Sequence, residues 1–152
     1  MGPDWEQAVG KFILALGGIE HTTISFFRVL PGCVLPKSAP KISLGLRIEM
    51  LKEALGRHQE VEYVEALRAI KAVDRLVSDR NLVAHNGVVF DFYTDGESIK
   101  ITSHLTSSRN GEKRLSLEQM QTLALKAHVA NLELSNAWIA IAKLGTEDAD
   151  RG

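Results

Sequence analysis

The chain has 152 residues, 45% of them hydrophobic, with a formal net charge of −1 and a single cysteine. This length suits one globular domain with its own core. One cysteine excludes an intramolecular disulfide and fits a reducing compartment. The near-neutral charge excludes nucleic-acid binding through a broadly basic surface, so such binding would require a local patch or two chains together.

The opening segment MGPDWEQ carries two acids and no basic residue, which argues against a signal peptide. No apolar run approaches the ~18 residues that cross a bilayer. We therefore expect a cytoplasmic protein that makes no membrane contact.

The first predicted element is an amphipathic helix from Trp5 to Leu30, because apolar residues recur there at helical spacing. Gly10, Gly17 and Gly18 lower its helix propensity. We interpret these glycines as room for close contact with another helix.

Positions 31–40 contain three of the four prolines and predict a loop. A second helix is expected from Ser43 to Leu55, with Gly56 placed to end it. A third follows from about Glu60 to His85. Its inward stripe is predicted to comprise Ala66, Ile70, Val73 and Val77, flanked by Ala69 and Leu76.

After Gly87 the apolar period changes from helical to alternating, which predicts a β-hairpin between Val88 and Leu105. Asp95 and Gly96 form a strong turn signal between its strands. A short third strand is expected at EKRL, residues 112–115. The alternating face of the hairpin requires cover from helices or from a second subunit.

The last predicted helix begins at Ser116, whose side chain can form a capping box with Gln119. Gly145 is expected to end it. The elements together predict a mainly α fold, a four-helix bundle with a β-hairpin inserted before the last helix. Residues 1–145 are predicted to form the single domain, and residues 146–152 a polar tail.

The stretch DRNLVAHNG, residues 79–87, places an arginine at the end of the third helix on its apolar face. Arg80 lies three residues after Val77 and seven after Val73, so all three share one direction. A guanidinium there is costly unless it is paired or lies in a cleft.

A polar line runs along the neighbouring side of the same helix and ends at His85. Its other members, at helical spacing, are Asp74, Ser78 and Asn81. An arginine and a histidine near a helix C-terminus also interact favourably with the helix dipole and with free carbonyls. A purely structural, helix-capping role therefore stays open for both residues.

The sequence RNLVAH resembles the Arg-x(4–6)-His motif of the HEPN superfamily (higher eukaryotes and prokaryotes nucleotide-binding), in which a polar residue commonly follows the arginine. Its position at the end of the third helix of a small four-helix domain adds to the resemblance. This resemblance implies a HEPN-like domain and a metal-independent endoribonuclease, with a role in defence or stress. Arg80, Asn81 and His85 would be the motif residues, at a cleft between the two chains of a homodimer.

The chemistry of RNA cleavage suits these side chains. Histidine can carry the protons of the 2′-hydroxyl and the leaving 5′-oxygen near neutral pH. Arginine can face two oxygens of the crowded phosphorane, and Asn81 can orient the ring or contact the phosphate. The expected products are a 2′,3′-cyclic phosphate and a 5′-hydroxyl. The alternative is a non-catalytic HEPN-like module that binds nucleotides or RNA, or that assembles proteins.

Toxin members of the superfamily carry His-x-Tyr, and a partner enzyme modifies that tyrosine. Here Asn86 and Gly87 follow His85 and offer no hydroxyl to modify, which argues against regulation of this kind. A regulatory partner protein of another, unidentified kind stays open.

Further candidates surround the motif. Glu20, on the first helix, is predicted to pair with Arg80 and hold its planar group, or alternatively with Arg47 on a partly solvated face. A weak RNA-binding patch is predicted from Arg75, Arg109, Lys113 and Arg114.

No metal or other cofactor is predicted. The five histidines and Cys33 show no ligand spacing. The sequence also has no nucleophile-elbow motif and no glycine-rich phosphate loop.

Overall fold

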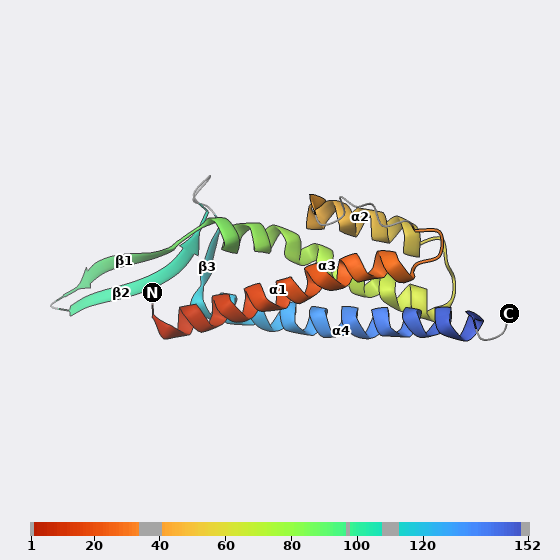
Figure 1. Cartoon of the computed structure of the whole chain (residues 1–152). Coiled ribbons are helices and arrows are strands. Elements are labelled where there is room, and N and C mark those ends of the chain that lie inside the picture. Colours follow the sequence, from red (N-terminus) through yellow and green to blue (C-terminus); the bar gives the residue numbers. More distant parts are fainter. Residues whose placement is uncertain (1, 34–40, 97, 108–112, 150–152) are drawn as a thin grey trace.

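A computed structural model describes residues 2–33, 41–96, 98–107 and 113–149 of the chain. Within them the chain is mainly helical, with four helices and a small antiparallel sheet inserted before the last helix (Figure 1). The elements are α1 (Pro3–Val29), α2 (Leu44–Leu55), α3 (Val61–His85), β1 (Val88–Asp95), β2 (Ser98–Thr106), β3 (Arg114–Ser116) and α4 (Leu117–Ala149). No helix in these ranges is both long and apolar enough to span a membrane.

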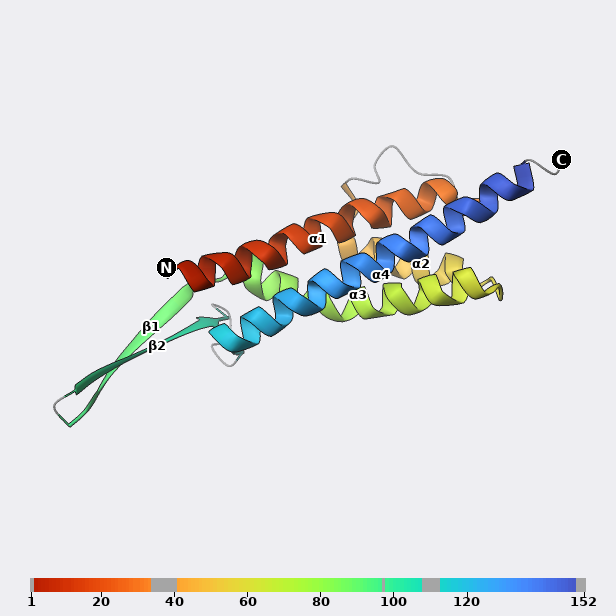
Figure 2. The ribbon, with the colours of Figure 1, turned by 90° about the horizontal axis from the view of Figure 1, so that it is seen from below.

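The helices form an elongated bundle around one core. α1 and α4 lie side by side and make the most extensive contact, while α3 packs on α4 and the short α2 packs on α3 and α1 (Figure 2). The apolar stripe predicted for α1 is buried at Trp5, Phe12, Ile19 and Phe26. The helices therefore form where the apolar period predicted them, because burying that stripe stabilises each helix.

One of the three glycines predicted to permit close helix contact does so. A Cβ atom on Gly18 would lie 2.6 Å from Nδ2 of Asn131 on α4. A Cβ on Gly10 or Gly17 would meet nothing within 4 Å. Of the three glycines, only Gly18 is therefore needed for the close approach of α1 and α4.

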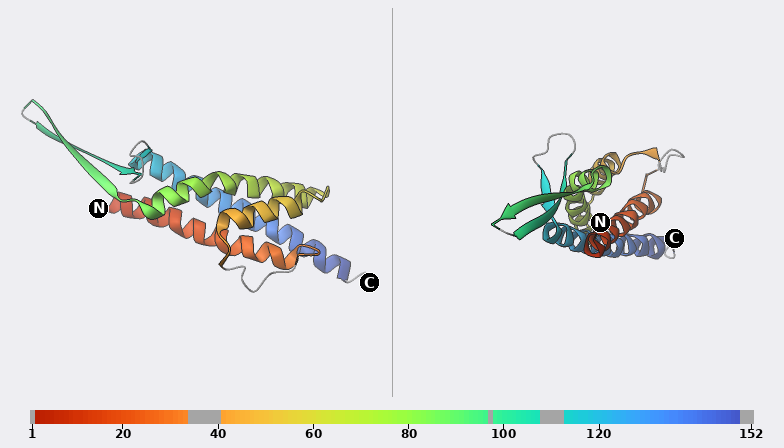
Figure 3. Two further views of the ribbon diagram at one scale, coloured as in Figure 1. Left: turned by 90° about the horizontal axis from the view of Figure 1, so that it is seen from above. Right: turned by 90° about the vertical axis from the view of Figure 1, so that its left-hand side faces the viewer.

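The predicted hairpin is confirmed. β1 and β2 pair antiparallel from Val88 opposite Leu105 to Asp95 opposite Ser98, and Gly96 takes a positive φ of 66° at the turn. β3 adds a short third strand along the base of β2, where Leu115 pairs with Leu105. The distal part of β1 and β2 projects beyond the end of the bundle as an arm (Figure 3).

The start of α4 follows the predicted capping box. The backbone N–H of Gln119 donates to Oγ of Ser116 over 3.2 Å, and the Gln119 side chain accepts from the N–H of Ser116 over 2.8 Å. The prediction that Gly145 ends the helix is wrong, because α4 continues to Ala149. Gly145 does not take the positive φ of a terminating glycine, so it costs helix propensity without breaking the helix. Residues 34–40 of the predicted loop and residues 150–152 of the predicted tail lie outside the described ranges.

Candidate functional site

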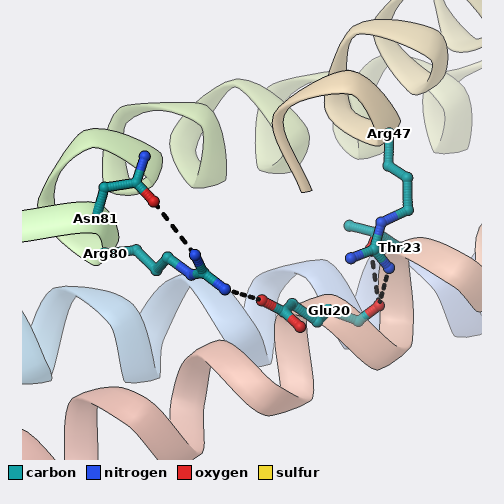
Figure 4. A network of polar contacts seen from close by, with 5 residues as sticks. All are labelled: Glu20, Thr23, Arg47, Arg80 and Asn81. Carbon is teal, nitrogen blue, oxygen red and sulfur yellow. Dashed lines mark hydrogen bonds and ion pairs between the residues drawn. The ribbon is translucent and has the colours of Figure 1, made fainter. Parts of the chain in front are cut away.

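Arg80 is held at the surface of the bundle by residues of two helices. Its Nη2 lies 3.4 Å from Oε1 of Glu20 on α1, and its Nη1 donates to Oδ1 of Asn81 over 3.2 Å (Figure 4). The side chains of Arg80 and Glu20 are each 37% exposed. Arg80 is thus paired without being sealed off, and a guanidinium with five N–H donors retains some for a further ligand.

Glu20 itself is held by a second arginine through a different atom. Buried Arg47 on α2 donates from Nη1 to the main-chain oxygen of Glu20 over 2.9 Å. The hydroxyl of Thr23 donates to the same oxygen over 2.8 Å (Figure 4). The two partners predicted as alternatives for Glu20 therefore both contact it, Arg80 at the carboxylate and Arg47 at the backbone.

This arrangement makes Arg47 a tie between α2 and the turn of α1 that carries Glu20. Burial lowers the pKa of its guanidinium from the ordinary value, and the nearby Glu20 carboxylate opposes that shift. Its Nε is buried with no hydrogen-bond partner among the described residues. Holding that backbone turn fixes the point from which the Glu20 carboxylate reaches Arg80.

His85 is the last residue of α3, and it is exposed. Next to it, the side-chain amide of Asn86 donates from Nδ2 to the main-chain oxygen of Leu82 over 2.7 Å. That bond satisfies one of the carbonyl groups that a helix end leaves without an intrahelical partner. At this carbonyl the capping role thus belongs to Asn86 and not to His85.

The polar line predicted along α3 is divided in the structure. Asp74 accepts a hydrogen bond from Lys52 of α2, with Nζ and Oδ2 2.5 Å apart. Hydrogen bonds to Asp74 and to Glu49 raise the pKa of the Lys52 ammonium. Ser78, two residues before Arg80, and Asn81 of the motif are both exposed. Asp74 therefore joins α3 to α2, whereas Ser78 and Asn81 lie on the exposed surface beside the end of the helix.

The predicted RNA-binding patch is largely neutralised where the structure describes it. Lys113 lies 2.7 Å from Oδ1 of Asp79, the residue before Arg80, and Arg114 lies 3.9 Å from Oδ2 of Asp91. Arg75 is exposed on α3, and Arg109 lies outside the described residues. The Lys113 contact attaches the residue just before β3 to the motif helix.

Two hollows of the described surface lie away from Arg80 and His85. A groove of about 730 Å³ runs between α1 and α4, with Leu14 and Leu125 among its lining residues. A second hollow of about 450 Å³ is lined by Asp79 but not by Arg80 or His85. The apolar stripes did not predict the groove, although Leu14 and Leu125 lie off those stripes and were its available signal.

No three His, Cys, Asp or Glu side chains in the described ranges are grouped so that they could hold a metal ion. Comparison of the chain with models of known protein families, with curated proteins and with solved structures finds no match in any of the three.

Proposed function

We propose that the chain is a metal-independent endoribonuclease of the HEPN type, in which Arg80, Asn81 and His85 act on the scissile phosphate. The observation that carries the proposal is that the motif side chains are oriented and yet exposed to solvent. Arg80 is oriented by Glu20 and Asn81 yet remains partly exposed, and His85 is exposed five residues further on. A structural ion pair would need neither the exposure nor an exposed histidine at the end of the same helix.

The roles follow from the side chains. A neutral imidazole can take the proton of the 2′-hydroxyl, and an imidazolium can return a proton to the leaving 5′-oxygen. Arg80 would stabilise the negative charge of the phosphorane, since its planar group keeps its charge and offers paired donors. Glu20 and Asn81 limit the motion of that group before RNA arrives, which lowers the cost of positioning it.

Two chains are part of the proposal. Five residues of helix separate Arg80 and His85 by about 140° around the axis, so one helix presents them in different directions. We propose a homodimer in which two copies of the motif face one cleft, about 10–20 Å apart, the width of a nucleic-acid groove. Each chain has a net charge of −1 and therefore lacks the broadly basic surface that holds RNA. A dimer would bring the local basic residues of two chains to one cleft.

The test is to incubate the purified protein with mixed RNAs in EDTA and to analyse the ends of any products. We expect 2′,3′-cyclic phosphates and 5′-hydroxyls, and a rate that falls at acidic pH because a general base must be neutral to accept the proton of the 2′-hydroxyl. His85→Ala should reduce the rate by ~10²–10⁴-fold, as should Arg80→Ala. The matched control is His58→Ala, because His58 lies in the connection between α2 and α3, at the opposite end of α3 from the motif, where it stacks on Tyr63.

Cleavage that is unchanged in His85→Ala would refute the catalytic proposal and favour a structural role for the motif. RNA that is bound but not cleaved by the wild-type chain would favour the second candidate, a non-catalytic HEPN-like module. The exposed apolar residues on one face of the arm support that candidate, because such a face is suited to protein assembly.

A further inference from the structure

The arm formed by β1 and β2 has one apolar face that continues the core outward. Side chains of directly paired residues lie on the same side of a sheet. The register therefore groups four large apolar residues on one side, the arm face: Phe90, Phe92, Ile99 and Ile101. At its base the arm face meets buried Leu105, whereas Phe92 and Ile99 towards the tip are 69% and 70% exposed.

The opposite side of the arm is mainly polar. The paired residues Asp91 and Thr102 lie there, as do Tyr93 and Lys100. Nδ1 of His104 on this side is 3.4 Å from Oδ2 of Asp91. The arm is thus an amphipathic ribbon, because the four large apolar residues of the arm face are continuous whereas the exposed apolar residues on the other side stand singly among polar ones.

The base of the arm is fixed to the bundle. The indole Nε1 of Trp5 on α1 donates to Oγ of Ser103 on β2 over 2.8 Å. Val88 and Leu105 pack with the core at the same level. These contacts present the arm in one direction, so a partner would not have to order it on binding. A two-stranded ribbon is marginally stable in water and gains from cover on its apolar face.

The groove between α1 and α4 is a second surface that no described residue covers, and five of its ten lining residues are apolar. Leu14 and Leu125 in its lining are 78% and 63% exposed, and Ala8, Ala15 and Ala124 line its deeper part. Two exposed leucines above small residues can receive the bulky side chains of a ribbon.

The arm cannot fill the groove of its own chain. The groove begins near the end of the bundle that carries the arm and follows α1 and α4 towards the middle of the molecule. The arm extends from that same end in the opposite direction (Figures 1 and 3). Only another molecule can bring the two surfaces together.

We infer that the arm is a dimerisation arm and that the arm face packs into the α1–α4 groove of a second copy of this chain. Each chain carries both surfaces, so a two-fold exchange satisfies both at once and closes without forming a filament. A net charge of −1 per chain opposes the association only weakly.

The area is sufficient for a stable dimer. The exposed parts of the four side chains on the arm face amount to roughly 400–500 Å². Two arms in two grooves, counted on both partners, would bury roughly 1,200 Å², at the lower end of the range of specific protein–protein interfaces. One arm seated alone would bury roughly half of that, below the range.

The inference does not depend on RNA cleavage, but it bears on the motif. His85 ends α3, and the arm begins three residues later at Val88. Seating the arm in a second copy would therefore bring the end of the motif helix close to that copy.

The first test measures association by light scattering over a dilution series. Phe92→Glu on the arm and Leu125→Glu in the groove should each weaken the dimer by ~100-fold or more, the effect of losing a central interface residue. Leu46→Glu is the matched control, because Leu46 is an exposed leucine on α2 outside both surfaces, and it should leave the dimer intact. Monomeric wild-type protein at micromolar concentration would overturn the inference, as would a dimer that survives both substitutions.

Mixing the two variants gives a second readout. The Leu125→Glu chain keeps a normal arm and the Phe92→Glu chain keeps a normal groove. The mixture should therefore form heterodimers through one intact contact, more weakly than the wild-type dimer but more strongly than either variant alone, which has no intact contact. The exchange would be contradicted if the mixture associated no more strongly than either variant alone at every concentration measured.

Cross-linking tests the pairing directly. In a Cys33→Ser background, a chain with Phe92→Cys mixed with a chain with Leu14→Cys should form a disulfide between the chains under mild oxidation. The Phe92→Cys chain alone should not cross-link to itself. A disulfide between two Phe92→Cys chains would show that the two arms pack against each other, and it would overturn the proposed contact between arm and groove.

Discussion

The helical body and the β arm treat the same kinds of residue in opposite ways. In the body, Phe12 and Phe26 lie fully buried where the helical period places them. In the arm, Phe90 and Phe92 follow an equally regular period and remain exposed, because no described helix lies over that face. A regular apolar pattern therefore specifies a face to be covered but does not specify what covers it.

The largest expected effect contrasts one phenylalanine from each region. Phe12→Ala should lower the free energy of unfolding by about 3–5 kcal/mol, because it removes a fully buried ring and leaves a cavity. Phe92→Ala, measured at a concentration where the chain is monomeric, should change it by less than about 0.5 kcal/mol. Denaturant titration of both variants checks the contrast. An equal loss in the two would mean that the arm face is covered within the monomer.

The next effect tests the packing of the body at neighbouring glycines of α1. Gly18→Ala should destabilise by about 1–2 kcal/mol, because the new Cβ forces the Asn131 side chain to move and outweighs the gain in helix propensity. Gly17→Ala, which meets open space, should stabilise by about 0.5–1 kcal/mol. Thermal unfolding distinguishes the two signs, and a stabilised Gly18→Ala would show that α1 and α4 have room to spare.

A smaller effect is expected where the arm joins the body. Trp5→Phe keeps most of the buried ring but removes the donor to Ser103, and it should cost about 1 kcal/mol. Ser103→Ala should cost a similar amount, and the double variant should cost less than the sum of the two. Additive losses in this double-mutant cycle would show that the bond does not couple the arm to α1.

The smallest effects concern the motif, which lies just before the junction of body and arm. Arg80→Ala should cost about 1 kcal/mol or less, since its pair with Glu20 is over a third exposed and 3.4 Å long. His85→Ala should leave the unfolding midpoint unchanged, because the exposed ring is not part of the core. Chemical denaturation of both variants, beside their activity, separates a loss of function from a loss of fold. A marked destabilisation by His85→Ala would point to a structural histidine.

Much of the body was predictable from local pattern. The stripe from Trp5 to Leu30 predicted α1 to within two residues, and the pair Asp95–Gly96 located the hairpin turn. The capping box at Ser116 and Gln119 was readable because both bonds join residues three apart. The failure at Gly145 came from treating a weak helix former as a stop, when only a left-handed backbone would have ended the helix.

The candidate site was predictable only in part. The sequence identified Arg80 and Glu20 as partners, but it left Arg47 as a rival for the same acid. The structure gives each arginine a different atom of Glu20, across separations of 60 and 27 residues. It also assigns Asp74 to Lys52 of α2, which no spacing within α3 could indicate.

Local pattern was enough to derive the helices, the hairpin, the order of these elements and the placement of Arg80, Asn81 and His85 at the end of α3. These features depend on periods and caps that operate within a few residues. The three-dimensional arrangement was needed to learn which atoms hold Arg80 and that Asn86 bonds the carbonyl of Leu82. It was also needed to learn that no described residue covers one face of the arm or the groove beside Leu14. Those outcomes depend on the directions in which the helices and the hairpin leave one another, and such directions are set by packing between residues far apart in the chain.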